Sequence, residues 1–342
     1  MRKRRPELDL LRCLAMVLVV SLHTIAPILG DVELYQTGVW RLCMGLDTIN
    51  RMGVPLFFML SGCLILNHSA TRSIGSFYQK HLLRLLVPLI VWNGIYGIWY
   101  EWRSGGEIAG IEILKALVRQ GVSSHMWFVY VLLGFYLLAP FLYRAVVECT
   151  DGQLLILLAV VLFYPTFCPI LNAILPVDFY LFGPIVEGCL GYVLMGCWLG
   201  RKQFSRRERM ALYLLGLLGY LWGTLGNLAA ASPKEIPLPM DGGYCLHHYL
   251  TSGAVFIWVQ TFCSRHVPCG TWRASILAHI SDLTFGVYWV HVLVLEWVTE
   301  KLGASPLAWQ SLGIGLGMTI GISLLFSEVA AKLPGIRRLL MG

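Results

Sequence analysis

The chain has 342 residues, of which 57% are hydrophobic and only 13% are charged, and its mean hydropathy is +0.69. So few charged residues cannot cover a water-facing surface of ordinary size, which excludes a soluble globular domain. The net charge of +7 is therefore interpreted through the positions of lysine and arginine along the chain. In a membrane protein these positions report topology, and they give no reason to expect nucleic-acid binding.

The apolar stretches are about twenty residues long, whereas the strands of a membrane β-barrel alternate over about ten. The sequence therefore predicts an all-α, polytopic membrane helix bundle that forms one integral-membrane domain over residues 1–342. About ten transmembrane helices are expected. Their predicted ranges are 8–29, 53–69, 82–102, 125–147, 153–170, 185–200, 210–228, 248–263, 277–298 and 306–331.

The basic residues predict the orientation. With a cytoplasmic N-terminus, nineteen of the 26 lysine and arginine residues fall in or beside the two tails and the loops on that side. Because cytoplasmic loops are enriched in these residues, both termini are predicted to be cytoplasmic. The first apolar run is interrupted by Asp9, Arg12 and His23, which favours a retained first helix over a cleaved secretory signal.

Two ionisable residues of the first span share one helix face. Arg12 and His23 are eleven residues apart, which leaves only ~20° between them around the axis and ~16 Å along it. Ionisable groups within the membrane are costly, and they usually face a protein interior or a wet cavity. This face is the strongest indication of a functional site, although an interfacial ion pair of Arg12 with Asp9 is the alternative.

A second polar group lies at the predicted inner start of the third span, where Lys80, His81 and Arg84 fall within about one turn. Clustered cations near a helix start suit phosphate groups. Anchoring by basic residues and contact with lipid headgroups explain the same pattern equally well.

Two further clusters occur near the fourth and ninth spans. His125, Trp127, Phe128 and Tyr130 precede or begin the fourth span, in a pattern that an aromatic belt would also produce. In the ninth span, Thr284, Tyr288 and His291 share one face. No metal centre is expected, and the adjacent His247 and His248 are interpreted as interfacial residues whose rings point apart.

Five segments, in order, make the chain resemble the acyltransferase-3 family of integral-membrane acyltransferases. They are Asp9-x-x-Arg12-x10-His23, the segment Val54-Pro-Leu-Phe-Phe-Met-Leu-Ser-Gly62, Lys80-His81-x-x-Arg84-x3-Pro88, His125-x-Trp127-Phe128, and Phe285-Gly-Val-Tyr-Trp-Val-His291. One departure is that the family often has two arginines where this chain has His81 and Arg84. Anion binding is therefore expected to depend on Lys80 as well.

The resemblance implies a donor, an acceptor and a location. The donor would be acyl-coenzyme A approached from the cytoplasm, with acetyl-CoA expected as the family's commonest donor. The acceptor would be a hydroxyl of a bacterial surface glycan or its lipid-linked precursor. The protein would then be a multi-pass protein of the bacterial cytoplasmic (inner) membrane, in contact with membrane lipids.

The chemistry of ester formation assigns roles to the candidate residues. An alcohol is a poor nucleophile at neutral pH, so a general base has to remove its proton, and His23 is the expected catalytic base. Arg12, Lys80 and Arg84 are the expected binding residues for the anionic coenzyme A. Trp127, Tyr288 and His291 are the expected substrate-binding residues.

Two functions of other classes remain open at this point. A transporter or flippase of a lipid-linked or anionic substrate would also bury Arg12, His23 and His291 beside a wet pathway, although inverted repeats are not evident. A membrane sensor or scaffold would need only the helix bundle. Turnover of acetyl-CoA by the purified protein separates an enzyme from both.

Overall fold

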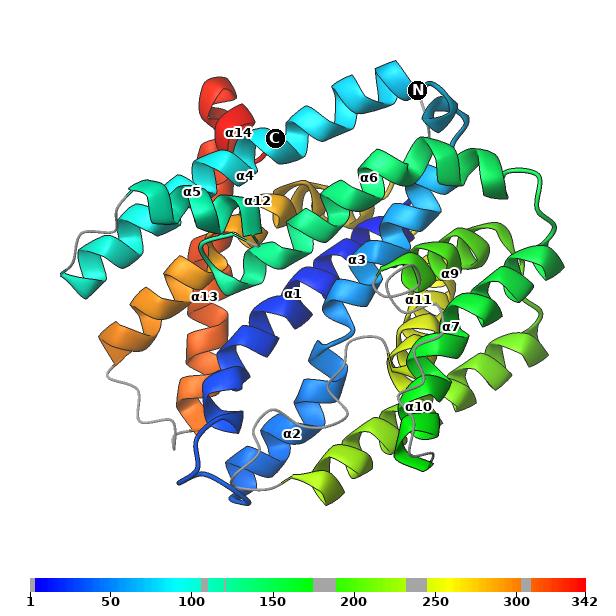
Figure 1. Ribbon diagram of the computed structural model, residues 1–342, viewed down its shortest axis with the longest axis horizontal. Coiled ribbons are helices and arrows are strands. Elements are labelled where there is room, and N and C mark those ends of the chain that lie inside the picture. Colours follow the sequence, from blue (N-terminus) through cyan, green and yellow to red (C-terminus); the bar gives the residue numbers. More distant parts are fainter. Residues whose placement is uncertain (1–3, 106–109, 120, 175–188, 232–244, 303–308) are drawn as a thin grey trace.

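The structure is a computed structural model that describes residues 4–105, 110–119, 121–174, 189–231, 245–302 and 309–342. Within these ranges the chain is all-α, as predicted, and has no strand (Figure 1). The helices are α1 (Pro6–Leu29), α2 (Gly38–Asn50), α3 (Gly53–Ser61), α4 (Ile74–Ser104), α5 (Gly110–Arg119), α6 (Trp127–Val146), α7 (Asp151–Ile174), α9 (Leu190–Arg201), α10 (Arg206–Ala230), α11 (Leu246–His266), α12 (Trp272–Leu302), α13 (Trp309–Lys332) and α14 (Pro334–Leu340). Three short pieces complete the order: a π-helix, η1 (Gly62–Leu66), and two 3₁₀ helices, η2 (Ser69–Arg72) and η3 (Ser124–Met126).

Seven helices of the described part are long and apolar enough to cross a membrane. They are Pro6–Leu29, Gly38–Leu66, Ile74–Ser104, Leu114–Val146, Arg206–Ala230, Trp272–Lys301 and Leu312–Lys332. The other three expected spans, 153–170, 185–200 and 248–263, overlap α7, α9 and α11, which are not among these seven, and residues 185–188 lie outside the described part of the chain. The multi-pass helical architecture is thus confirmed, while the count of about ten spans stays a prediction.

The second span begins earlier than the sequence pattern predicted. Its expected start was residue 53, but the apolar helical segment already begins with α2 at Gly38. Thr37 caps α2 by accepting a hydrogen bond from the backbone N–H of Trp40. The charges of Asp47 and Arg51 lower the hydropathy of this segment, so the hydropathy pattern did not predict the helix. They form an ion pair of 2.6 Å, one turn apart, which offsets the cost of burying Asp47.

Helix α1 lies at the centre of the arrangement. It packs against α2, α3, α11, α12 and α13, and Figure 1 shows it running obliquely through the bundle beside α3. On another side α4 and α6 pack together, and α14 contacts α4. Arg12 near the start of α1 and Gly342 after α14 line one cavity, so both lie at the same end of the bundle. The cytoplasmic location of that end stays a prediction.

Glycine allows α3 and η1 to approach α9 closely. A side chain at Gly62 would collide with the backbone of Val193, and one at Gly196 would collide with the backbone of Met59. Small residues of this kind let two membrane helices pack backbone to backbone. Helix α3 supplies Phe57 and Ser61 to the cavity described below, so this contact fixes one of its walls.

Aromatic side chains connect α4 to α12. The rings of Trp92 and Trp289 are stacked with centroids 6.3 Å apart and an interplanar angle of 2°. The Tyr96 hydroxyl donates a hydrogen bond of 2.9 Å to the backbone oxygen of Trp289. Trp92, Tyr96 and Trp289 are fully buried, so these contacts position the ninth predicted span against the third.

Candidate active site

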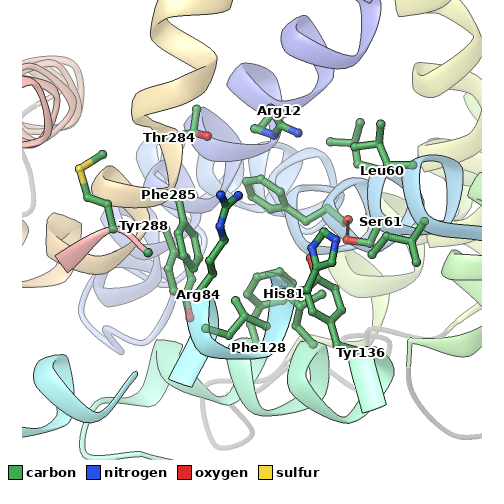
Figure 2. A pocket seen from close by; sticks show the side chains of 17 residues that line it. Arg12, Leu60, Ser61, His81, Arg84, Phe128, Tyr136, Thr284, Phe285 and Tyr288 are labelled. Atoms are coloured by element: carbon green, nitrogen blue, oxygen red, sulfur yellow. Dashed lines mark hydrogen bonds between the residues drawn. The ribbon is translucent and has the colours of Figure 1, made fainter. Parts of the chain in front are cut away.

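A cavity of about 380 Å³ opens between α1, α3, α4, α6 and α12 (Figure 2). This volume lies in the range of small-molecule binding sites. Its wall is largely aromatic, and Arg12, His81 and Arg84 add cationic or titratable side chains. The aromatic side chains are Phe57, Phe128, Tyr136, Phe285 and Tyr288.

Arg12 reaches this cavity from α1. Its guanidinium donates a hydrogen bond of 2.9 Å to the Ser281 hydroxyl, and it lies 3.7 Å from an Asp9 oxygen. Asp9 is nevertheless bound mainly by Arg4, which donates to both carboxylate oxygens at 2.8 and 3.1 Å. Arg12 is therefore not the principal partner of Asp9. Because a guanidinium has five N–H donors, most of those on Arg12 remain available for a ligand.

Arg84 and His81 reach the cavity from α4, and Figure 2 shows both side chains beside its aromatic wall. Arg84 is exposed and has no hydrogen bond or ion pair with any described residue through its side chain. The His81 ring lies 4.5 Å from the Phe77 ring and 5.8 Å from the Tyr136 ring, centroid to centroid. The cavity therefore has one arginine free to bind an anion and one histidine held by aromatic contacts.

Two of the predicted binding residues, Lys80 and Trp127, are exposed at the surface and do not line the cavity. Lys80 is exposed and does not line it, although its neighbour His81 does. Trp127 is 36% exposed and also lies outside the lining, whereas the next residue, Phe128, is part of the wall. A helix turns by ~100° per residue, so adjacent residues point to different sides. The motif positions are close in sequence, but only one residue of each pair reaches the cavity.

Three histidines from distant parts of the chain meet beside this cavity. His23 comes from α1, His125 from η3 and His291 from α12. The centroid of the His23 ring is 5.2 Å from that of His291 and 6.3 Å from that of His125, and the rings of His125 and His291 are 5.1 Å apart. We call these three residues the histidine cluster.

The hydrogen bonds of His291 assign its tautomer. Nδ1 lies 2.6 Å from the backbone oxygen of Tyr288, which can only accept, so Nδ1 carries the hydrogen. Nε2 of a neutral His291 is then an acceptor. It is buried and has no hydrogen-bond partner in the described part of the chain. Nε2 of His125 is also buried without a partner among those residues.

Tyr288 connects the cavity to the histidine cluster. Its side chain lines the cavity, its hydroxyl donates 2.8 Å to the backbone oxygen of His125, and its backbone oxygen accepts from His291. Arg12 and His23 both belong to α1, but only Arg12 lines the cavity itself. The site is thus continuous: Arg12 and Arg84 line the cavity, and Tyr288 joins the cavity to the histidine cluster through its hydrogen bonds.

His125 was not predicted to be a site residue. It begins the motif that contains Trp127, but only Trp127 was predicted to bind substrate. His125 is only 3% exposed and contacts both other histidines. A signal was present in the sequence, because a histidine at a predicted helix start inside a membrane protein is itself a costly residue.

The other histidine pair differs from its expected state. His247 and His248 are both fully buried, and their ring centroids are 4.0 Å apart, so the prediction of interfacial rings pointing apart is wrong. Their burial arises where α11 packs against α10, with His247 directly beside Gly223. Among the residues that the structure describes, no group of three or more His, Cys, Asp or Glu side chains is arranged to hold a metal ion.

The sequence matches the acyltransferase-3 family, whose family description is "acyltransferase domain", over residues 5–328. The match covers nearly the whole chain, and the protein therefore belongs to this family of membrane acyltransferases. Comparison with curated proteins and with solved structures gave no match.

Proposed function

We propose that this protein is a membrane O-acyltransferase that moves an acyl group, acetyl in the first instance, from acyl-coenzyme A to a hydroxyl of a bacterial surface glycan or its lipid-linked precursor. The protein would work in the cytoplasmic membrane of a bacterium. The observation that carries the proposal is the continuity between a cation-bearing aromatic cavity and a buried histidine cluster, joined at Tyr288.

The cavity suits the donor. Coenzyme A carries phosphates and a long thioester arm, and arginine binds phosphate through several charge-assisted hydrogen bonds. None of the side-chain N–H groups of Arg84 donates to a described residue, and Arg12 donates one hydrogen bond to Ser281. The aromatic wall beyond them offers an apolar path for the arm, so that the thioester would lie near Tyr288. Lys80, exposed on the same helix, would add positive charge outside the cavity.

The histidine cluster suits the acceptor. Two buried imidazole acceptors, Nε2 of His125 and Nε2 of His291, lack a donor within the described part of the chain. An unpaired buried acceptor costs free energy, on the order of 1–3 kcal/mol. A sugar hydroxyl carries a single hydrogen and can provide an O–H donor to one of these atoms at a time. The cluster is therefore suited to hold a hydroxyl, and Tyr288 and His291 would bind it; Trp127 would contact the glycan from the exposed side.

His23 is the proposed general base. Its ring makes no hydrogen bond to any described residue, and it lies beside His291 at the edge of the cluster. His23 would take the hydroxyl proton as the oxygen attacks the thioester carbon. The new C–O bond forms, the C–S bond breaks, and the thiolate of coenzyme A leaves with the bonding electron pair. The proton then passes from the histidine to the thiolate or to water.

Purified protein reconstituted in vesicles, with acetyl-CoA labelled in the acetyl group, tests the proposal. Free coenzyme A thiol should appear, and its release should rise when an extract of lipid-linked glycan is added. Mass spectrometry should then find the label as an ester on the glycan. Absence of both hydrolysis and transfer, with movement of a lipid-linked substrate across the vesicle, would instead identify the transporter alternative.

A further inference from the structure

A chain of hydrogen bonds leads from the histidine cluster to a carboxylate on α12. Nδ1 of His125 is 3.0 Å from the Ser123 hydroxyl, and that hydroxyl is 3.2 Å from the hydroxyl of Tyr100. The Tyr100 hydroxyl in turn donates to Oε1 of Glu296 at 3.1 Å. The chain thus joins η3, α4 and α12 through Ser123 and Tyr100.

Glu296 accepts a hydrogen bond through each of its two carboxylate oxygens. Trp99 donates its indole N–H to Oε2 at 2.7 Å, and Tyr100 donates to Oε1. The guanidinium of Arg103 lies 3.8 Å from Oε2. Two donors and a cation surround the carboxylate, so both of its oxygens act as acceptors in this arrangement.

An acceptor at one end fixes the direction of every bond in the chain. Tyr100 gives its single hydroxyl hydrogen to Glu296, so its oxygen has to accept from Ser123. Ser123 gives its single hydrogen to Tyr100, so its oxygen has to accept from Nδ1 of His125. His125 is therefore protonated at Nδ1, and its unpartnered Nε2 is the basic nitrogen.

We propose that Glu296 is a positioning residue that acts through Tyr100 and Ser123 to hold His125 in the tautomer whose Nε2 keeps its lone pair free beside His23 and His291. The inference rests on the proposed function for its catalytic meaning. Neither Glu296 nor Ser123 lines the cavity, so neither would touch the donor. Their effect reaches the reaction through one atom, Nε2 of His125.

The consequence for catalysis follows from the neighbouring ring. His291 also presents a free Nε2, because its Nδ1 donates to Tyr288. Two adjacent imidazoles with lone pairs cannot hydrogen bond to one another, and each needs a donor from outside. The acceptor hydroxyl carries a single hydrogen, so on binding it supplies a donor to one of them at a time. Once His23 has taken the hydroxyl proton, the two lone pairs stabilise the positive charge that has formed in the cluster.

Glu296→Gln makes a specific prediction, because the new amide has one acceptor and one donor group. The indole of Trp99 can only donate, so the amide oxygen should face Trp99 and the amide N–H should face Tyr100. Tyr100 would then accept and donate to Ser123, and Ser123 would donate to His125. The substitution should therefore move the hydrogen of His125 from Nδ1 to Nε2.

Solid-state NMR of the full protein in lipid, with ¹⁵N-labelled histidine, reads this tautomer directly. His125→Gln identifies the His125 signals by their loss. We expect protonation at Nδ1 in the wild type and at Nε2 in Glu296→Gln. In the acyl-transfer assay, Glu296→Gln should lower kcat by ~10²-fold with an unchanged KM for acyl-CoA, the size expected when one group that stabilises transition-state charge is lost. Tyr100→Phe, which interrupts the chain, should lower kcat in the same direction.

Glu300→Gln is the matched control, since Glu300 lies one turn further along α12 and 3.4 Å from the same Arg103, but outside the chain. It should leave both the tautomer and kcat unchanged. Protonation of His125 at Nε2 in the wild type would overturn the proposal, and so would a fall in kcat of Glu296→Gln without a change of tautomer. The NMR measurement needs no turnover, so failure of the proposed function is recognised separately, by a wild type that transfers no acyl group.

Discussion

The two ends of the site differ in what their polar groups offer. At the cavity, Arg12 is half-buried and Arg84 is exposed, and both present hydrogen-bond donors. In the histidine cluster, His125 and His291 are buried and present acceptors. Donors that water can reach serve to capture an anion, whereas acceptors kept from water serve to hold a hydroxyl and to stabilise the charge that forms when His23 takes its proton. The comparison predicts that substitutions in the cavity change binding, and that substitutions in the cluster change the rate.

Reversed topology would break this comparison most completely, since the donors would then face away from cytoplasmic coenzyme A. A cysteine introduced at Arg206 should be shielded from an impermeant thiol reagent in intact cells, and one at Glu33 should be labelled. Both positions are exposed in the structure. A parent that carries Cys269→Ser removes the native cysteine that is exposed among the described residues. Labelling at Arg206 alone would show that the orientation is the reverse of the predicted one, with Arg12 and Arg84 facing away from the cytoplasm.

Loss of the base should give the largest kinetic effect. His23→Ala should lower acyl transfer by ~10²–10⁴-fold while donor binding is retained, because a base acts in the transition state and does not dock coenzyme A. His291→Ala should have a smaller effect, mainly a higher KM for the acceptor. Both variants are compared in the reconstituted assay. Near-normal turnover by His23→Ala, or complete loss confined to His291→Ala, would assign the base to α12.

Removing the open arginine should affect binding instead of rate. Arg84→Ala should weaken donor affinity by ~10–100-fold, since charge-assisted hydrogen bonds contribute ~1.5–3 kcal/mol. kcat at saturating donor should remain near that of the wild type. Arg144→Ala is the control, because Arg144 is an exposed arginine of α6 outside the cavity. Equal affinities of the two variants and the wild type in calorimetry would show that Arg84 only anchors its helix.

Packing between α3 and α9 should influence the cavity more than the cluster, because α3 carries Phe57 and Ser61. Gly196→Ala places a methyl group against the backbone of Met59 and should destabilise the protein by ~1–3 kcal/mol. Thermal unfolding in detergent measures the loss as a lower Tm. Gly94→Ala on α4 is the control, since nothing lies within 4 Å of the added carbon. Equal Tm values for the two variants would contradict the close contact seen here.

Local patterns in the sequence were sufficient for several features. Apolar stretches of membrane length predicted the helices, and the eleven-residue spacing placed Arg12 and His23 on one face of α1. The ordered motifs indicated the family that the match over residues 5–328 shows. These features depend on composition and on the helical repeat, and both can be read along a single segment. Helix α2 was missed because Asp47 and Arg51 lower the hydropathy of this segment, and only the structure shows that these two charges pair with each other.

The tertiary structure decided which side chains meet. It placed the ring of His125 beside those of His23 and His291, and it paired Asp9 with Arg4. It also placed His81, but not Lys80, in the lining of the cavity. These contacts join residues from different helices, or select one of two neighbours on the same helix. The helical repeat fixes the face on which a residue lies, but the crossing of helices determines what that face meets. The sequence by itself therefore determined a membrane bundle with a polar face on its first helix, and only the packing of α1 against α12 and η3 turned that face into a site.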